Sequence, residues 1–185
     1  MDELLDIVND EDIVTGQEMR STAHQLGLQH RGVHAFLFTP DGKLLVQKRS
    51  ADRAAYPSML DCSVSEHVKA GESYLEAAIR GIKEEMGIDG IEIKPLIRFR
   101  MNYGVNDNEI STLYEGIVDP NRINFDPVEI EEVNYYSLND LQEMIKASNV
   151  KFCAWFMELL NWYHGKPTKM SFNFQQSKGS LSKHN

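Results

Sequence analysis

The sequence predicts an α/β protein, and two observations support this class. Short apolar runs bounded by turn residues, rich in valine, isoleucine, leucine and phenylalanine, lie within residues 31–65 and 91–136 and are typical of strands. A helical pattern at 73–86 separates these two groups, and two further helical patterns lie between 137 and 163. We therefore expect strands, one helix, more strands and then two covering helices.

The first 30 residues are predicted to form a separate extension. Residues 4–8 and 13–14 are apolar on either side of a polar turn, which indicates a small hairpin that Gly16 would break. Residues 18–25 are polar and indicate one or two helical turns. We therefore expect residues 1–30 to be an N-terminal hairpin with a short helical extension.

The first group of strands leads into the predicted helix. A strand at 31–39 is followed by the turn Pro-Asp-Gly-Lys at 40–43, in which proline presets one dihedral angle and glycine permits the next. The chain returns as a strand over 44–47. After a loop, a short strand at 60–65 precedes the helix.

The predicted helix at 73–86 has defined ends. Ser73 and Glu76 have the spacing of a capping box, which satisfies the free amide groups at a helix start. Gly87 supplies the left-handed residue that ends the helix. The apolar stripe that we expect to be buried consists of Leu75, Ala78, Ile79, Ile82 and Met86.

The second group of strands and the last helices complete the predicted domain. Strands are expected at 91–103, 109–118 and 131–136, and helices at 141–147 and 152–163. Residues 31–165 are therefore predicted to form one domain. The polar residues 166–185 show little periodicity and are predicted to be a flexible tail.

Composition excludes several classes of protein. The 42% hydrophobic content can fill a core, yet no apolar run approaches the roughly 20 residues of a membrane span, so no membrane partner is expected. The net charge of −9 argues against nucleic acid as a partner and suits a protein that recruits cations. Cys62 and Cys153 show no zinc-site spacing and indicate reduced thiols in a cytoplasmic protein.

The stretch around the predicted helix resembles the Nudix box, usually written G-x5-E-x7-R-E-U-x-E-E-x-G-U, where U is an aliphatic residue. Seven positions match in register: Glu72, Arg80, Ile82, Glu84, Glu85, Gly87 and Ile88. Two positions depart from the pattern, because Glu66 stands at the first glycine and Gly81 at the glutamate that follows the arginine. The second departure bears on the activity more than on the fold.

The resemblance implies a fold and a chemistry. The implied fold is an α/β/α sandwich with a mixed central sheet. The implied activity is divalent-metal-dependent hydrolysis of a small-molecule diphosphate linked to an organic moiety, with Mg²⁺ or Mn²⁺ as cofactor. Glu84 and Glu85 would hold the cation, Glu72 near the helix start would be a further metal residue that supports the loop, and Arg80 would orient a glutamate. Clustered carboxylates fit this role, because Mg²⁺ takes oxygen ligands.

A second resemblance covers most of residues 4–145 and points to the isopentenyl-diphosphate-isomerase-like branch of the same family. It rests on Leu28-Gln29-His30-Arg31, Val46-Gln47-Lys48-Arg49-Ser50 and Tyr56-Pro57-x-Met59-Leu60-Asp61. The metal ligands of that branch fall on His24, His30, His67, Asp107 and Glu109. Such a set would suit Zn²⁺, Mn²⁺ or Fe²⁺ better than Mg²⁺. Taken alone, histidines such as His24 and His30 are more often surface or hydrogen-bonded core residues than ligands, and residues 107–109 are also explained as a polar turn.

One departure argues against a simple isomerase. Ser65 stands where the branch places a proton-transferring cysteine, opposite a glutamate that would be Glu109, and serine is a far weaker acid than cysteine. Cys62 lies at an odd spacing from Ser65, which along one strand puts it on the opposite face. Isomerisation is therefore the second candidate function. A non-catalytic diphosphate-binding module is the third, because Gly81 lacks the box carboxylate.

Basic residues after the second strand are candidates for the substrate contact. Lys48, Arg49 and Arg53 lie where the branch places diphosphate contacts, although a solvated strand end explains them too. The general base stays open between Glu109, Asp107 and Glu129, and Glu109 is the candidate that we add to Glu84 and Glu85 as catalytic. A glutamate in place of Gly81 is expected to tighten metal binding, because it would share a helix face with Glu84 and Glu85.

Overall fold

A seven-stranded mixed sheet lies at the centre of the computed structural model, which describes residues 2–53 and 55–172. Its strands are β3 (His30–Phe38), β4 (Leu44–Arg49), β5 (Leu60–Asp61), β6 (Val64–His67), β7 (Ile93–Asn102), β8 (Asn108–Ile117) and β9 (Ile130–Tyr136). The main order is β5-β4-β3-β8-β7, with β6 paired to β3 and β9 paired to β4. The β3–β8 pair is parallel and the other pairs are antiparallel, so the sheet is mixed as expected.

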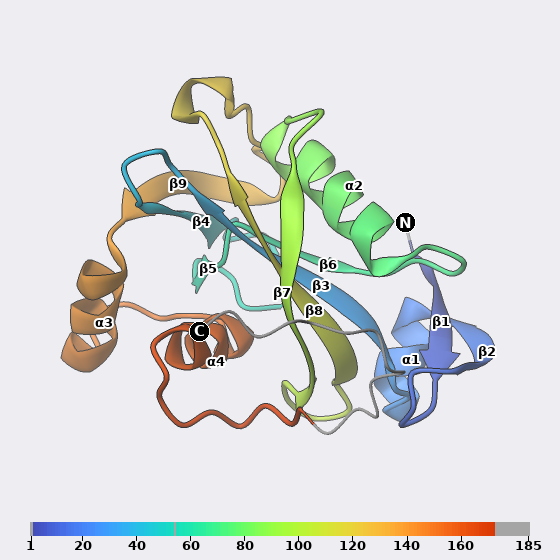
Figure 1. Cartoon of the computed structure of the whole chain (residues 1–185). Coiled ribbons are helices and arrows are strands. Elements are labelled where there is room, and N and C mark those ends of the chain that lie inside the picture. The colour runs from blue at the N-terminus through green and yellow to red at the C-terminus, as the bar shows by residue number, and fades with distance from the viewer. Residues whose placement is uncertain (1, 54, 173–185) are drawn as a thin grey trace, which may run out of the picture.

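Helices cover both faces of this sheet (Figure 1). Helix α2 (Tyr74–Met86) lies on one face, and α3 (Leu138–Ala147) and α4 (Ala154–Tyr163) lie on the other. Successive residues of β3 serve opposite layers: Leu37 packs in the cluster of α2, whereas Phe36 packs against Phe156 of α4. The α/β/α sandwich is therefore confirmed. A short 3-10 turn, η1 (Pro120–Arg122), follows β8.

The N-terminal segment forms the two-stranded hairpin β1 (Leu4–Val8) and β2 (Val14–Met19), followed by α1 (Arg20–Leu26). The expectation that Gly16 breaks the hairpin is wrong, since Gly16 pairs with Ile7 inside it. The whole of β2 is exposed, so a missing side chain costs no packing there.

This hairpin also holds the loop that precedes α2. Leu5 forms a β-bridge with Lys69, and the amide of Ala70 donates to the Leu4 carbonyl at 2.8 Å. The Asp6 carboxylate accepts from the Gly71 amide at 2.9 Å. The residues before the sheet therefore fix the backbone at the start of α2.

The strand expected at 60–65 is divided into β5 and β6. Between them, the Ser63 hydroxyl donates to the Leu45 carbonyl at 2.6 Å and accepts from the Leu37 amide at 2.9 Å. The Ser63 side chain therefore bridges the backbones of β3 and β4 next to Phe38 and Leu44, where the two strands pair directly. The chain therefore kinks at Cys62 and Ser63, which matters for the orientation of Cys62.

The end of the predicted tail, residues 173–185, lies outside the described residues. Before it, Ser171 exchanges two backbone hydrogen bonds with Arg100 of β7, at 2.8 and 2.9 Å, and Met170 is buried. The first part of the predicted tail is thus attached to the sheet. No helix within the described residues is long and apolar enough to cross a membrane.

Candidate active site

A cavity of about 770 Å³ lies beside β6, and its wall carries two groups of ionisable residues. The carboxylate end consists of Glu66 and Glu84, which line the cavity, and the buried Glu85 behind them. The histidine end consists of four lining residues and the buried His30; the lining residues are His24, His67, Asp107 and Glu109. Strand β6 joins the two ends, because Glu66 and His67 are consecutive on it.

Helix α2 points a carboxylate into the protein. The capping box of Ser73 and Glu76 is present, and Gly87 ends the helix with φ of 69°. The expected apolar stripe is only partly buried, since Leu75 and Ile79 are 44% and 40% exposed. The buried face is turned toward Gly81 and Glu85 instead, so the helix directs Glu85 inward.

The Arg80 guanidinium joins the glutamates of the box. It binds both oxygens of Glu72, at 2.9 and 3.1 Å, and its Nη1 donates to Glu66 at 3.1 Å and to Glu84 at 3.0 Å. Nη2 also donates to the His67 carbonyl at 2.8 Å. The arginine thus orients carboxylates, as expected.

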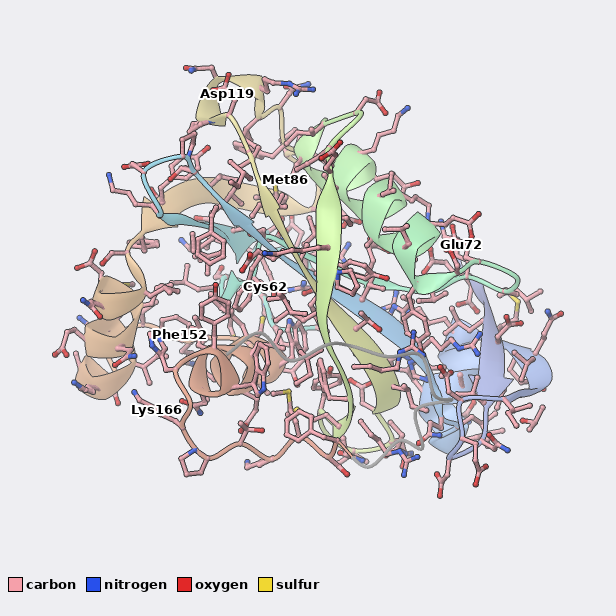
Figure 2. The ribbon with its side chains drawn as sticks, in the orientation of Figure 1. Cys62, Glu72, Met86, Asp119, Phe152 and Lys166 are labelled. Carbon is pink, nitrogen blue, oxygen red and sulfur yellow. The ribbon has the colours of Figure 1, made fainter. Side chains whose placement is uncertain are left out.

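Glu72 does not fit the role of metal ligand that the resemblance gave it. Both of its oxygens are held by Arg80, and Oε2 also accepts from the Lys69 amide at 3.0 Å. Figure 2 shows Glu72 at the start of α2, at the loop held by the N-terminal hairpin. Its contacts brace that loop.

Glu85 is the buried acid of the carboxylate end. Its Oε2 accepts from Gln47 Nε2 at 2.7 Å, whereas its Oε1 is buried and has no hydrogen-bond partner among the described residues. Burial, together with the nearby Glu66 carboxylate, raises the pKa of Glu85 well above its ordinary value. An orphaned carboxylate oxygen beside other carboxylates fits a hard divalent cation.

Three imidazoles meet at the histidine end, from α1, β3 and β6. The ring centroids of His24, His30 and His67 lie 4.9 to 5.2 Å apart, and the Nε2 atoms of His24 and His67 are 3.2 Å apart. His30 Nδ1 bonds to the Leu28 carbonyl at 2.9 Å, which directs Nε2 into the cluster. That Nε2 has no hydrogen-bond partner among the described residues. Burial lowers the pKa of all three imidazoles, which favours the neutral form that binds metals.

Two carboxylates complete the histidine end. Glu109 Oε1 lies 3.7 Å from Nε2 of both His30 and His67, and Asp107 Oδ1 lies 3.9 Å from His24 Nδ1. Burial, with Asp107 beside it, raises the pKa of Glu109 to about 8. The described part of the chain offers the Asp107 Oδ1 atom no hydrogen bond. Imidazole and carboxylate donors with unsatisfied atoms fit a transition-metal ion better than Mg²⁺.

The structure corrects the expected position of Cys62. Its Sγ lies 3.0 Å from the Ser65 hydroxyl, so the two side chains share one side, and the expectation of opposite faces is wrong. The kink at Cys62 and Ser63 breaks the alternation on which that expectation depended. The thiol is fully buried, in the middle of the molecule in Figure 2, and burial raises its pKa well above the ordinary value.

A chain of hydrogen bonds connects Ser65 with Glu109. His34 bonds Ser65 Oγ through Nδ1 at 3.1 Å and Tyr103 Oη through Nε2 at 3.0 Å. Tyr103 donates to Ser111 at 3.2 Å, and Ser111 donates to Glu109 at 2.8 Å. Sequence reasoning missed His34, Tyr103 and Ser111. The histidine within an apolar strand was the one available signal.

Of the three basic residues expected to contact the substrate, two line the cavity and one does not. Arg49 and Arg53 line the cavity, where Arg49 pairs with Asp61 at 3.0 Å and Arg53 with Glu129 at 2.6 Å. Lys48 does not line it and pairs with Glu131 at 2.7 Å, because successive residues of β4 point to opposite faces. The expectation that Lys48 contacts substrate is therefore not supported.

Comparison with known proteins identifies the family to which this architecture corresponds. The model of the NUDIX domain matches residues 28–156. An uncharacterized Nudix hydrolase from Streptomyces coelicolor is 36% identical over 141 residues, covering 73% of each chain. An isopentenyl-diphosphate Delta-isomerase from Serratia proteamaculans is 30% identical and covers 86% of this chain and 90% of its own.

A solved structure shares the fold. The protein DR0079 from Deinococcus radiodurans superposes with a TM-score of 0.75 at 30% identity, covering 86% of this chain and 98% of its own. The similarity therefore includes both the hydrolases and the isomerases of this architecture.

Proposed function

The chain belongs to the Nudix family, and on that premise we propose that it is a divalent-metal-dependent hydrolase that cleaves a small-molecule diphosphate linked to an organic moiety. The observation that carries this proposal is the buried Oε1 of Glu85, which finds no hydrogen-bond partner in the described part of the chain and lies beside the carboxylates of the cavity wall. A buried carboxylate without a partner is costly, and a bound cation would offset that cost.

Glu84 and Glu85 are the residues that would hold Mg²⁺ or Mn²⁺. When bound there, the cation would shield the phosphate charge and lower the pKa of a ligated water. Arg80 keeps Glu84 in place, and Gln47 keeps Glu85 in place. Arg49 and Arg53 offer planar guanidinium groups to the diphosphate from the same cavity.

Glu129 is the candidate for the base that removes a proton from water. It lines the cavity, pairs with Arg53, and its charge acts on Glu85. Glu109, the base that the sequence favoured, faces the imidazoles instead, and Asp107 lies beside His24. We therefore assign Glu109 and Asp107 to the second metal site.

The histidine end is proposed to hold a transition-metal ion through His24, His30, His67, Asp107 and Glu109. In each of two triplets among them, the ligand atoms lie within 4.8 Å of one another. The free thiols of Cys62 and Cys153 support a reducing compartment, and the cytoplasm is the proposed location.

The test is an assay of a panel of nucleotide, isoprenoid and sugar diphosphates with Mg²⁺ and Mn²⁺. Phosphate release that requires the metal and falls away in Glu85→Gln is the expected result. Binding of a diphosphate without turnover under every metal condition would instead establish the non-catalytic module.

Isomerisation of isopentenyl diphosphate is the second candidate function. The histidine end and the hydrogen bonds from Ser65 to Glu109 favour it, whereas the buried Cys62 thiol is a poor acid. We expect no appreciable conversion by the natural sequence, and a gain in Ser65→Cys. Rapid conversion by the natural sequence would displace the hydrolase proposal.

A further inference from the structure

The two residues that depart from the box motif contact each other. Glu66 lies on β6 and Gly81 on α2, and a Cβ atom built on Gly81 would lie 2.7 Å from Glu66 Cγ and 2.9 Å from Val64 Cγ1. Real Cβ atoms do not approach other atoms so closely. The side chain of Glu66 therefore occupies space that a residue larger than glycine would need.

That space belongs to the helix face that binds metal in the proposed function. Position 81 precedes Glu84 by three residues and Glu85 by four, so a side chain there would lie over the same face. Gly81 contributes no carboxylate to this face. Glu66 brings one to it from the neighbouring strand.

The contacts of Glu66 connect it to the box. Its carboxylate accepts from Arg80 Nη1 at 3.1 Å, and the same nitrogen donates to Glu84 at 3.0 Å. After burial, the charge of Glu66 is the largest cause of the raised pKa of Glu85. Glu66 also lines the cavity, with 16% of its side chain exposed.

We propose that Glu66 supplies from β6 the metal-binding carboxylate that α2 lacks at position 81, so that the cation site at the carboxylate end consists of Glu66, Glu84 and Glu85. The two departures from the box motif are then related, because the carboxylate absent from position 81 of α2 is supplied by Glu66 of β6. The buried Oε1 of Glu85, which has no hydrogen-bond partner within residues 2–53 and 55–172, is the independent sign that a ligand is missing there. This inference rests on the proposed function.

The structure reverses one sequence expectation. Gly81→Glu alone was expected to tighten metal binding. With Glu66 in place, the new side chain collides with Glu66 and Val64, and a third charge enters the same space. A glutamate at position 81 should therefore bind metal only when Glu66 is replaced by glycine at the same time.

The test is a double-mutant cycle over Glu66→Gly and Gly81→Glu, with Mg²⁺ binding measured by calorimetry and by the metal-induced rise in Tm. Mg²⁺ is the probe because oxygen ligands suit it, whereas the imidazoles favour transition metals. We expect at least tenfold weaker binding in Glu66→Gly. We expect a lower Tm without tighter binding in Gly81→Glu, and binding within about threefold of wild type in the double variant.

Two further variants give the cycle its controls. Glu66→Gln keeps the shape and the polar contact with Arg80 but loses the charge, so it should bind Mg²⁺ as weakly as Glu66→Gly. Glu76→Gln removes one charge from the exposed first turn of the same helix and should bind like wild type.

The outcomes separate this inference from the proposed function. If Glu85→Gln abolishes Mg²⁺ binding while both Glu66 variants bind normally, Glu66 is only a partner of Arg80, and the inference fails while the hydrolase proposal stands. Failure of the double variant to recover binding would also overturn it. If the wild-type protein binds no Mg²⁺ and Glu85→Gln leaves its Mn²⁺ binding unchanged, the proposed function fails and the inference with it.

Discussion

The two ends of the cavity limit the repulsion between their acidic groups by different means. At the carboxylate end, the guanidinium of Arg80 contacts Glu66 and Glu84, and Glu85 lies beside them with one oxygen that no described residue hydrogen-bonds. At the histidine end, burial keeps the imidazoles neutral and the pKa of Glu109 near 8. Burial raises the pKa of one acid at each end, Glu85 and Glu109, so a cation competes with a proton at both. At the first end it also competes with the Arg80 guanidinium, whereas at the second it meets neutral imidazoles, so the two ends should differ in metal preference.

The largest expected effect separates the two ends through Glu85→Gln. We expect metal-dependent hydrolysis to fall by about 1000-fold, or roughly 4 kcal/mol of transition-state stabilisation, because the amide loses the charge that holds the cation. Gln47 can still donate to the new side chain, so Tm without metal should not fall. Steady-state kinetics and thermal unfolding measure the two quantities. Unchanged Mg²⁺ affinity and rate would remove Glu85 from the site.

The next effect concerns pH and His34, whose imidazole bonds Ser65 and Tyr103. The pKa of His34 falls from 6.5 to about 4 through burial, so below pH 6.5 the unfolded chain binds a proton that the folded protein does not. Stability is therefore lost as pH falls from 6.5 to 4, by about 3 kcal/mol for this group. In urea unfolding, the free energy of unfolding of His34→Gln should therefore fall by about 3 kcal/mol less than that of the natural protein between these two pH values. Parallel pH profiles for both proteins would contradict this.

Glu109 should act in the opposite direction. Its folded pKa of about 8 lies above its ordinary value of 4.5, so its contribution is complete below pH 4.5 and is lost as pH rises toward 8. In the absence of metal, Glu109→Gln should therefore reduce the decline of the free energy of unfolding between pH 4.5 and 8. Comparison of His34→Gln with Glu109→Gln then shows which pH-dependent change in stability comes from each group.

A smaller effect tests whether the two ends bind metal independently. His30→Gln should lose the stabilisation by Zn²⁺, which is about 2.7 kcal/mol at one hundred times the dissociation constant. The Mg²⁺-induced rise in Tm should remain, because it depends on the carboxylate end. Thermal unfolding with each metal provides the measurement. Loss of both responses would mean that the two ends form one site.

The smallest effect distinguishes cations inside and outside the cavity. Arg53→Ala should raise KM about tenfold, equivalent to roughly 1.4 kcal/mol of lost phosphate contact. Lys48→Ala should change KM less than about twofold, because Lys48 does not line the cavity and pairs with Glu131 outside it. Loss of such a surface pair should also cost about 1 kcal/mol of stability or less. Equal effects of the two substitutions would show that the diphosphate extends beyond the cavity.

Local patterns were enough to predict much of this molecule. The capping box of Ser73 and Glu76 and the glycine end of α2 depend on residues close in sequence, and so does the apolar run of β3. The motif itself placed Glu84 and Glu85 on α2. The histidine end came from resemblance, because its members lie on α1, β3, β6 and the start of β8.

What the sequence could not predict depends on contacts between distant segments. The role of Glu66 follows from the packing of β6 against Gly81, which no local pattern encodes. The position of Cys62 follows from the kink that Ser63 makes between β3 and β4. The hydrogen bonds from His34 to Ser111 require the parallel register that places β3 beside β8.

The hairpin that precedes the family domain limits how this protein can be divided. The family model begins at residue 28, yet His24 lies before that boundary and β1 holds the loop at Lys69 to Gly71. A recombinant fragment cut at residue 28 would keep the sheet and α2 but lose one imidazole and the support of the motif loop. Under the proposed function, exchange of this N-terminal segment between relatives would replace one imidazole of the histidine end, so a graft of the domain should begin at β1.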